Sequence, residues 1–383
     1  MADGVVRAAP QPLLGAQEAY LPIIEASNHA SNLLSLPDGD LLDFWFAGTW
    51  EGNSDVSIVM SRLDHNAGVW TLPKVVASRP GWSNQNPVPF LSPTGKLLLF
   101  YTSQKAHGGE TTSAIYEMTS EDEGRTWTGQ RPAFSKPGSF DRQHIVVDRD
   151  EWLFPIYIAA GFGIGSNSQN DQSIVEVSQG SGATWKACPV PGSGGLVQMD
   201  IVKSPPDGLL AFFRSRYADW IYESKSPDGC HWTDPVATCL PNNNASIQAV
   251  RLEDGHLVMA FNNTQATTSR GEPRSASRGI LSVALSVDNG RTWPWVRDVQ
   301  SGPTPPEFRP GEDLEYSYPS IIQSPNGTLH MSFTFRRETI KYLSFSEDWI
   351  KGGHTAGVFD GSCRGLPGDK DKGQKPFDLS LRK

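Results

Sequence analysis

Short runs of apolar and β-branched residues alternate with turn sequences along most of the chain. Glycine suits a tight hairpin because it reaches positive φ without a steric cost, and five of six recurring turns contain it. The six turns are residues 36–40 (LPDGD), 92–96 (SPTGK), 147–151 (VDRDE), 205–209 (PPDGL), 252–256 (LEDGH) and 324–328 (SPNGT). The runs that follow, such as KLLLFYT and TLHMSFTF, are too short for helices. This pattern predicts β-hairpins and little helix.

A second phrase recurs between these hairpins and ends in tryptophan. Four copies, SEDEGRTW, SQGSGATW, SPDGCHW and SVDNGRTW, end at Trp127, Trp185, Trp232 and Trp293, and degenerate copies lie at Trp70 and Trp349. Successive tryptophans are 47 to 61 residues apart, which is the period of a repeat architecture. Each repeat reads as four antiparallel strands, or one blade. The sequence therefore predicts an all-β fold, a six-bladed β-propeller of four-stranded antiparallel blades.

The repeats also predict the domain organisation. We expect residues 1–350 to form a single propeller and residues 351–383 to form a polar, loosely held C-terminal tail. Two long irregular stretches, residues 264–278 and 301–315, are the expected binding loops or lids.

The repeated phrase itself has a structural explanation. Its Ser and Asp side chains can bond backbone groups within the turn, its Gly takes positive φ, and its Trp covers apolar surface. We therefore expect Asp122 and Asp288 to be structural, and the chemistry to lie outside the phrase.

Charge and composition limit the classes of partner. The 383-residue chain has a formal net charge of −9, whereas proteins that bind nucleic acid usually present a basic face. No apolar run approaches the length of a membrane span. We expect neither a nucleic-acid nor a membrane partner, and the sequence does not indicate the oligomeric state.

The cysteines and the N-terminal sequence bear on the compartment. The four cysteines show no metal-ligand spacing, and we expect free thiols, with a Cys230–Cys239 pair as the alternative. The N-terminal sequence lacks the basic start and apolar core of a signal peptide, which favours a cytoplasmic location. Glycosylation sequons at Asn244, Asn262 and Asn326 favour instead a secreted protein whose signal peptide has been removed.

The Asp-containing repeats resemble those of the sialidase-like family with Asp-box (BNR) repeats, the predicted neuraminidases, over about residues 20–350. The resemblance implies a site at the centre of one face of the propeller. It also implies a neutral Tyr nucleophile activated by a Glu, an Asp that serves as acid and base, and a cluster of arginines that holds the carboxylate of the substrate.

The resemblance suggests catalytic candidates in the last and first repeats. The segment 315–337 begins EYSY, which places Tyr316 at the nucleophile position, with Tyr318 as a second candidate if the strand is regular. Asp55 resembles the acid/base Asp, and Glu51 is a nearby alternative. The family's first clamp arginine is replaced by His29, which can act as an acid or a base near neutral pH.

Further polar residues are candidates for binding the substrate. Arg214 resembles a clamp arginine, Gln198 lies near the position of the activating Glu, and Asp200 could replace that Glu if it faced inward. Gln198 cannot accept a proton, which puts the ordinary nucleophile mechanism in doubt. The other candidates are Arg142, Arg216, Arg336, Arg337, Trp82, Asn84, Gln85, Asn86, His144, Asn244 and Gln248.

Three functions fit these residues. The first is an exo-acting glycosidase that removes a terminal anionic sugar, and the second is a lyase of uronate-containing glycans that uses His29 or Tyr316 for proton transfer. The third is a propeller without hydrolytic activity, either a glycan-binding module or a fold recruited for other small-molecule chemistry. Residues 161–168 (GFGIGSNS) lack the strand and helix of a dinucleotide site, so we expect no cofactor and no metal.

Overall fold

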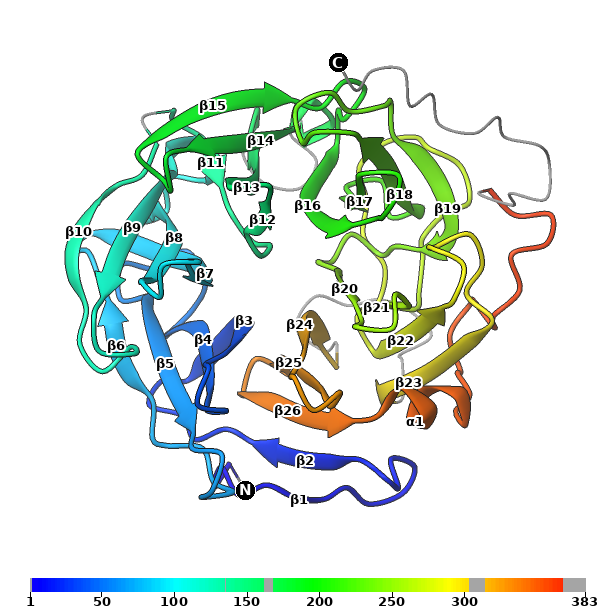
Figure 1. Ribbon diagram of the computed structural model, residues 1–383, viewed down its shortest axis with the longest axis horizontal. Helices are drawn as coiled ribbons and strands as arrows, with labels where there is room; N and C mark the ends of the chain where they lie inside the picture. The colour runs from blue at the N-terminus through cyan, green and yellow to red at the C-terminus, as the bar shows by residue number, and fades with distance from the viewer. Residues whose placement is uncertain (1, 135, 162–167, 303–313, 368–383) are drawn as a thin grey trace. The chain divides into compact units, whose positions relative to one another are not determined.

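The computed structural model describes residues 2–134, 136–161, 168–302 and 314–367, and almost all of its regular structure is β. The chain divides into two compact units. The first unit comprises Met1–Arg142 and Asp313–Trp349, and the second comprises Gln143–Glu312 and Ile350–Lys383. Each unit contains three antiparallel sheets, whose strands are labelled in Figure 1.

The first unit begins with two sheets of four strands each. One has the order β3-β4-β5-β6, with β3 (Ser27–Ser35), β4 (Leu41–Gly48), β5 (Ser57–Leu63) and β6 (Lys74–Ala77). The other has the order β10-β9-β8-β7, with β7 (Trp82–Leu91), β8 (Leu97–Lys105), β9 (Ala114–Ser120) and β10 (Thr128–Pro132). The short elements η1 (Glu110–Thr112) and β11 (Ser139–Phe140) follow.

The third sheet of the first unit joins the two ends of the propeller sequence. Its order is β1-β2-β26-β25-β24, with β24 (Tyr316–Gln323), β25 (Leu329–Phe335), β26 (Thr339–Phe345), β2 (Gln17–Tyr20) and β1 (Arg7–Ala8). Thus the N-terminal strand β2 lies beside β26 as the fourth strand of the last blade, and β1 lies at the edge. The short helix α1 (Glu347–Lys351) follows β26.

The second unit contributes three more blades. Their strands are β12 (Val146–Asp148), β13 (Glu151–Ile158), β14 (Gln172–Gln179) and β15 (Thr184–Pro189), then β16 (Leu196–Lys203), β17 (Leu209–Ser215), β18 (Trp220–Ser226) and β19 (Val236–Pro241), then β20 (Gln248–Arg251), β21 (Leu257–Asn262), β22 (Ile280–Ser286) and β23 (Trp295–Ser301). One short helix, η2 (Ser168–Asn170), precedes β14. The prediction of an all-β, six-bladed β-propeller is confirmed.

The Asp-box turns are structural, as predicted. Asp122 accepts hydrogen bonds from the backbone and hydroxyl of Thr126 at 2.7 and 2.6 Å, and Gly124 has a φ of 82°. Asp288 makes the same pair of bonds to Thr292. The box tryptophans Trp70, Trp232 and Trp293 are buried in hydrophobic clusters, which explains why the phrase ends in Trp.

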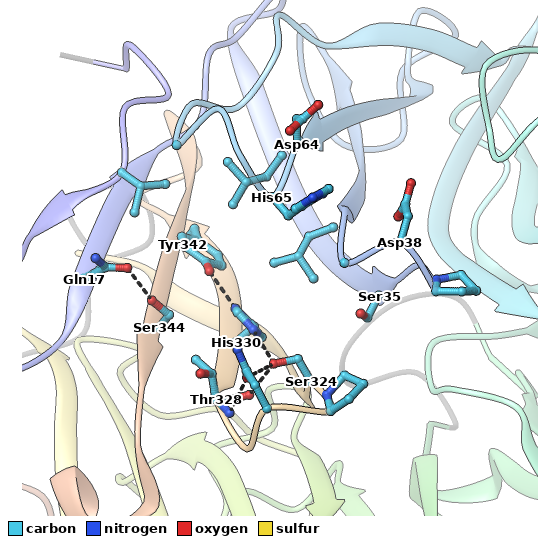
Figure 2. A pocket seen from close by; sticks show the side chains of 18 residues that line it. Gln17, Ser35, Asp38, Asp64, His65, Ser324, Thr328, His330, Tyr342 and Ser344 are labelled. Atoms are coloured by element: carbon cyan, nitrogen blue, oxygen red, sulfur yellow. Dashed lines mark hydrogen bonds between the residues drawn. The ribbon is translucent and has the colours of Figure 1, made fainter.

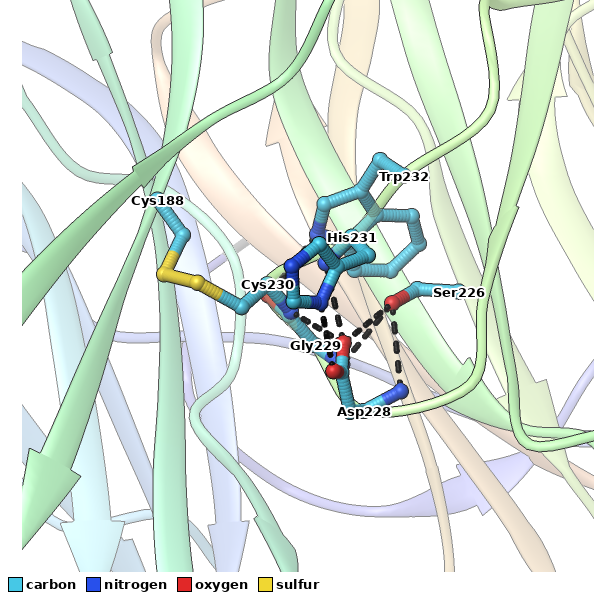
Figure 3. The surroundings of a disulfide bond; sticks show 7 residues. All are labelled: Cys188, Ser226, Asp228, Gly229, Cys230, His231 and Trp232. Atoms are coloured by element: carbon cyan, nitrogen blue, oxygen red, sulfur yellow. Dashed lines mark hydrogen bonds and ion pairs between the residues drawn. A yellow bond between two sulfur atoms is a disulfide. The ribbon is translucent and has the colours of Figure 1, made fainter. Parts of the chain in front are cut away.

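The expectation of free cysteines is wrong, because all four form disulfides. Cys188 of β15 pairs with Cys230, whose Asp-box turn also contains Asp228 and Trp232 (Figure 3). Cys239 of β19 pairs with Cys363, across 124 residues of chain. The alternative Cys230–Cys239 pair is also wrong, because each bridge instead joins separate elements of the second unit.

The described part of the C-terminal tail is held firmly, contrary to the loose attachment expected. Besides the Cys239–Cys363 bridge, the Asn263 side chain donates to the Phe359 carbonyl and accepts from its N–H, both at 2.8 Å. Phe359 and Cys363 are buried in the same hydrophobic cluster as Trp293. Residues 351–367 are therefore part of the packed second unit.

Candidate active site

The first strand of each blade in the first unit contains a β-bulge. Ala30 in β3, Asn86 in β7 and Tyr318 in β24 have φ of 59°, 49° and 54°, and the strand register shifts at each of them. Such backbone is uncommon outside glycine and costs about 1–3 kcal/mol. A bulge bends the strand and redirects its side chains. The regular alternation that would put Tyr316 and Tyr318 on one face is therefore absent from β24.

The bulges bring two predicted residues together, His29 and Tyr318. Their ring centroids lie 4.3 Å apart. His29 is 1% exposed, and its Nδ1 lies 2.8 Å from the Thr334 hydroxyl and 3.7 Å from a Glu315 carboxylate oxygen. A histidine oriented by a hydroxyl and lying near a carboxylate is suited to proton transfer. This pair is therefore the candidate for proton transfer in the first unit.

Glu315 holds this arrangement together, although the sequence did not single it out. Its carboxylate accepts hydrogen bonds from the Ser317 hydroxyl at 2.6 Å and from Arg337 Nε at 2.8 Å. Arg337 also donates to the Glu51 carboxylate at 2.7 Å. Burial opposes the charge of Arg337, but the carboxylates of Glu51 and Glu315 outweigh it and raise the pKa of the guanidinium. The predicted Glu51 and Arg337 are thus paired with each other.

The turn that carries Arg336 and Arg337 is strained. Both residues have left-handed φ, 55° and 56°, although neither is glycine. The turn is fixed from both sides, because the Arg336 N–H donates to the Glu315 carbonyl at 2.6 Å and the Arg337 carbonyl accepts from Asn28 at 2.8 Å. Arg336 is half exposed and lies 3.4 Å from the Glu338 carboxylate. These hydrogen bonds hold the turn in this conformation, with Arg337 beside Glu315.

Asp55, predicted as the acid/base residue, stabilises a loop. Its carboxylate accepts the Thr49 N–H at 3.0 Å, and hydrogen bonding to Thr49 lowers its pKa. A general acid at neutral pH needs a raised pKa, so the acid role receives no support. Asp55 closes the loop of residues 49–55, which carries Glu51.

Tyr316, the first nucleophile candidate, packs against another aromatic residue. It is 4% exposed, and its ring centroid lies 5.2 Å from that of Phe335. The nucleophile role remains a prediction, and the ring contact of Tyr318 with His29 favours Tyr318 for it.

Arg142 donates hydrogen bonds to two of the bulges of the first unit, those of β3 and β24. Its guanidinium donates to the carbonyls of Ser31, Tyr318 and Pro319 at 2.9 to 3.0 Å, and these lie within the bulges of β3 and β24. A bulge releases carbonyls from the strand ladder, and buried carbonyls need donors. Arg142 supplies them, so these donors are directed at the backbone and not at a substrate carboxylate.

Two buried carboxyl groups lie in the field of Arg142. Burial raises the pKa of Asp43 to about 7 and that of Asp141 to about 8, and the charge of Arg142 only partly offsets this. The Thr102 hydroxyl donates to Asp141 at 2.5 Å. Both carboxyl groups therefore hold their protons through much of the neutral range.

The polar candidates of the second blade mostly support the backbone. Asn84 donates to the Val56 carbonyl at 2.9 Å, and Gln85 donates to Ser83 at 3.1 Å. Trp82 lies under the Arg79 guanidinium, 4.2 Å from the ring centroid. Asn86 is the buried bulge residue of β7. Asn84 in particular anchors the end of the loop that carries Glu51.

In the second unit, Arg214 is fixed by neutral amides. It donates to the Asn244 side-chain oxygen at 2.9 Å and to the Gln198 side-chain oxygen at 3.0 Å. Gln198 and Asn244 both have left-handed φ, and the β16 register shifts at Gln198. These two contacts orient the guanidinium of Arg214.

The other candidates of the second unit have structural partners. Arg216 makes an ion pair with the buried Asp171 at 2.9 Å. Gln248 donates to Gln143 at 3.0 Å, and Gln143 in turn donates to the carbonyls of Gln198 and Ile247. Asp171 and Gln143 were not predicted, since nothing in the sequence distinguishes them from ordinary polar residues.

The structure also shows where Asp200, the first expected loop and His144 lie. The Asp200 carboxylate accepts the N–H of Ala249, so it caps the backbone of β20. Within the first expected loop, Ala266 and Thr267 donate to the carbonyl of Ala218. His144 is half-buried. Residues 303–313 of the second expected loop and 162–167 of the glycine-rich segment lie outside the described residues.

A cavity of about 640 Å³ lies at the other end of the strands of the first unit (Figure 2). There His330 bonds the Tyr342 hydroxyl at 2.7 Å and the Ser324 hydroxyl at 3.0 Å, and burial lowers the pKa of His330 to about 4. Asp64 and His65 line the same cavity. None of the residues predicted for the site lines it, so the cavity and the His29–Tyr318 pair are separate features.

Comparison with known proteins agrees with this architecture. Residues 39–331 match the family profile of the BNR repeat-like domain. The Hadza microbial sialidase Hz136 has a TM-score of 0.67 at 16% identity, with 85% of this chain and 67% of that chain covered. The intramolecular trans-sialidase from Ruminococcus gnavus, in complex with oseltamivir carboxylate, has a TM-score of 0.67 at 12% identity, with 92% and 99% covered.

A leech intramolecular trans-sialidase complexed with 2,7-anhydro-Neu5Ac is similar as well, with a TM-score of 0.66 at 14% identity and 86% and 69% of the two chains covered. No curated protein sequence matches the chain. At these identities the solved structures establish the fold, whereas the profile spans most of the sequence. The chain belongs to the BNR repeat-like domain family, the sialidase-like proteins with Asp-box repeats.

Proposed function

We propose that the chain is a glycosidase that removes a terminal anionic, sialic-acid-like sugar from a glycan. The observation that carries this proposal is the contact of Tyr318 with the buried His29, which Thr334 and Glu315 orient. A neutral tyrosine can attack an anomeric centre that bears a carboxylate without the repulsion that an anionic nucleophile would meet. His29 would take the phenol proton as Tyr318 bonds to the anomeric carbon and pass it to the departing glycosidic oxygen as that bond breaks. Water would then hydrolyse the bond between the sugar and Tyr318, releasing the free sugar and restoring the phenol.

The carboxylate of the substrate needs a cation. Arg142, Arg216 and Arg337 donate to backbone carbonyls or protein carboxylates. In the second unit, the side-chain oxygens of Asn244 and Gln198 orient Arg214, which we propose as a carboxylate-binding residue. The sialidases among the similar structures support a sialic-acid-like substrate.

A uronate lyase is the second candidate, and His29 favours it. In that reaction His29 would remove the proton from the carbon next to the uronate carboxylate, and Tyr318 would protonate the departing glycosidic oxygen, leaving a carbon–carbon double bond in the sugar. A base and an acid in ring contact suit elimination as well as hydrolysis.

Product analysis separates the candidates. The full chain is incubated with sialosides and with uronate-capped oligosaccharides, in parallel with Tyr318→Phe and Tyr316→Phe. Hydrolysis predicts free sugar, and elimination predicts an unsaturated uronate that absorbs ultraviolet light. The absence of both products from every anionic glycan would overturn both enzymatic proposals and favour a glycan-binding propeller.

We also propose that the chain matures in an oxidising compartment, as a secreted protein. Its two disulfides support this, since such bridges form outside reducing cytosol. No helix in the described residues is long and apolar enough to cross a membrane. Thiol titration in denaturant without reductant tests the pairing in protein from its native host. No free thiol is expected, and four free thiols would contradict the proposal.

A further inference from the structure

One aromatic side chain is exposed beside the candidate site. Trp50 is 63% exposed, and it is the only aromatic residue among the exposed large hydrophobic side chains of the described residues. It immediately precedes Glu51, which pairs with Arg337. An exposed Trp next to a catalytic cluster presents a large flat apolar surface to anything that enters.

The loop that carries Trp50 is held in place at several points. Asp55 accepts the Thr49 N–H at 3.0 Å, and Asn53 donates to the Thr49 hydroxyl at 3.0 Å and to the Trp50 carbonyl at 3.1 Å. The carbonyl of Gly52 accepts the His107 N–H of the neighbouring blade at 3.1 Å. A fixed loop presents its aromatic ring with little loss of conformational entropy on binding.

The charges around Trp50 indicate what it binds. Its loop carries the carboxylates of Glu51 and Asp55, and hydrogen bonding to Thr49 lowers the pKa of Asp55, so this carboxylate is ionised at neutral pH. Glu51 is paired with Arg337, so the loop of residues 49–55 offers a second anionic sugar the ionised Asp55 and no cation of its own. A neutral pyranose has an apolar face of C–H groups that can pack on indole, and hydroxyls that can donate to nearby carboxylates.

We propose that Trp50 binds the neutral sugar adjacent to the terminal anionic sugar, so that the substrate is an oligosaccharide rather than a simple monosaccharide glycoside. This inference rests on the proposed function for the terminal sugar. The platform, by which we mean Trp50 on its loop of residues 49–55, is nevertheless a binding site that can be measured without turnover.

The test measures binding of neutral disaccharides by saturation-transfer NMR and calorimetry. The probes are lactose, N-acetyllactosamine and cellobiose, with the full chain and its Trp50→Ala, Trp50→Phe and Leu72→Ala variants. Leu72 is the matched control because it is 67% exposed and apolar but lies away from the loop. We expect at least one probe to bind, Trp50→Ala to weaken it about tenfold, and Trp50→Phe to weaken it less. Leu72→Ala should bind as the unaltered chain does.

Two results would overturn the platform: no probe binds the unaltered chain, or Trp50→Ala binds as tightly as Leu72→Ala does. Turnover is measured separately on a sialylated or uronate-capped trisaccharide. Trp50-dependent binding without any product would reject the proposed reaction and keep the platform. Product formation with unchanged kcat/KM in Trp50→Ala would reject the platform and keep the reaction.

Discussion

At the residue scale, backbone conformation decides which of two tyrosines is available for chemistry. The sequence EYSY offers Tyr316 and Tyr318 on equal terms, and family resemblance favours the first. The bulge in β24 packs Tyr316 against Phe335 and places Tyr318 against His29. A sequence pattern of period two cannot anticipate this, because the bulge breaks the period.

Substitution of the two tyrosines tests this assignment. Tyr318→Phe should lower kcat at least about 100-fold, because it removes the hydroxyl that reacts or protonates, with little change in KM. Tyr316→Phe should change kcat less than about fivefold. Steady-state kinetics on the substrate identified by product analysis checks both values. The reverse order of effects would return the nucleophile role to Tyr316.

The buried Asp141 predicts a pH-dependent stability. Its pKa is about 8 in the folded state and 3.8 in the unfolded reference, so the folded state keeps a proton that the unfolded chain releases. Stability should therefore fall as pH rises from about 4 to 8, by up to about 1.4 kcal/mol per pH unit for this group.

Asp141→Asn should reduce that dependence to the part that the buried Asp43 contributes, since the amide cannot ionise and its oxygen can still accept from Thr102. Urea unfolding at pH 5, 6, 7 and 8 measures it. Parallel curves for the variant and the unaltered chain would show that Asp141 does not hold a proton in the fold.

At the scale of elements, the sequence repeats predicted the blades but not the β-bulges that shape the candidate site. The hairpins, the Asp-box turns and the small helix content followed from glycine, aspartate and tryptophan positions. The bulges of the first strands did not, because their left-handed residues are Ala30, Asn86, Gln198 and Tyr318, which share no side-chain chemistry. The sequence indicates Asn86 as a polar residue for binding the substrate, and the family resemblance indicates Gln198 and Tyr318, whereas the bulged backbone explains the position of all three.

Substitution of a bulge residue tests its conformational role. Asn86→Val should destabilise the fold by about 1–3 kcal/mol, because a β-branched residue is poorly tolerated at a φ of 49°. Asn86→Gly should cost less, since glycine adopts this φ freely. Denaturant unfolding compares the two. Equal losses would mean that the amide contacts of Asn86, and not its backbone, stabilise the bulge.

At the scale of the whole molecule, covalent links add to the repeat architecture. The two disulfides join elements separated by 42 and 124 residues. The longer bridge holds residues 351–367 on the second unit, so a segment that composition suggested was loose is packed. Composition could not predict this, because the pairing partner of Cys363 lies two repeats away in the sequence.

Removal of each bridge should show the effect of loop length. Replacing Cys239 and Cys363 by Ser should cost more stability than replacing Cys188 and Cys230, by about 1 kcal/mol if loop-closure entropy dominates. Urea unfolding of the two double variants measures the difference. Limited proteolysis should cut residues 351–367 only in the Cys239/Cys363 variant, and equal resistance of both would show that Phe359 packing suffices to hold the segment.

Burial distinguishes the three glycosylation sequons. Asn244 and Asn262 are each 1% exposed, whereas Asn326 lies in the exposed turn between β24 and β25. Expression through a eukaryotic secretory pathway should therefore yield folded protein with one glycan, at Asn326. Glycopeptide mass spectrometry with an Asn326→Gln control checks this. A glycan on Asn244 or Asn262 in active protein would be incompatible with the packing described.

The bulges also bear on how this fold diversifies. Arg142 and Gln143 donate hydrogen bonds to the carbonyls of bulge residues in β24 and β16, so this part of the bulge stabilisation does not depend on the side chain of the bulge residue. Residues that tolerate a left-handed φ can therefore replace one another at these positions, and the group that faces a ligand can change while the bulge is kept. Among relatives, variation at residues 30, 86, 198 and 318 should follow ligand preference, and these positions are the places to begin redesign.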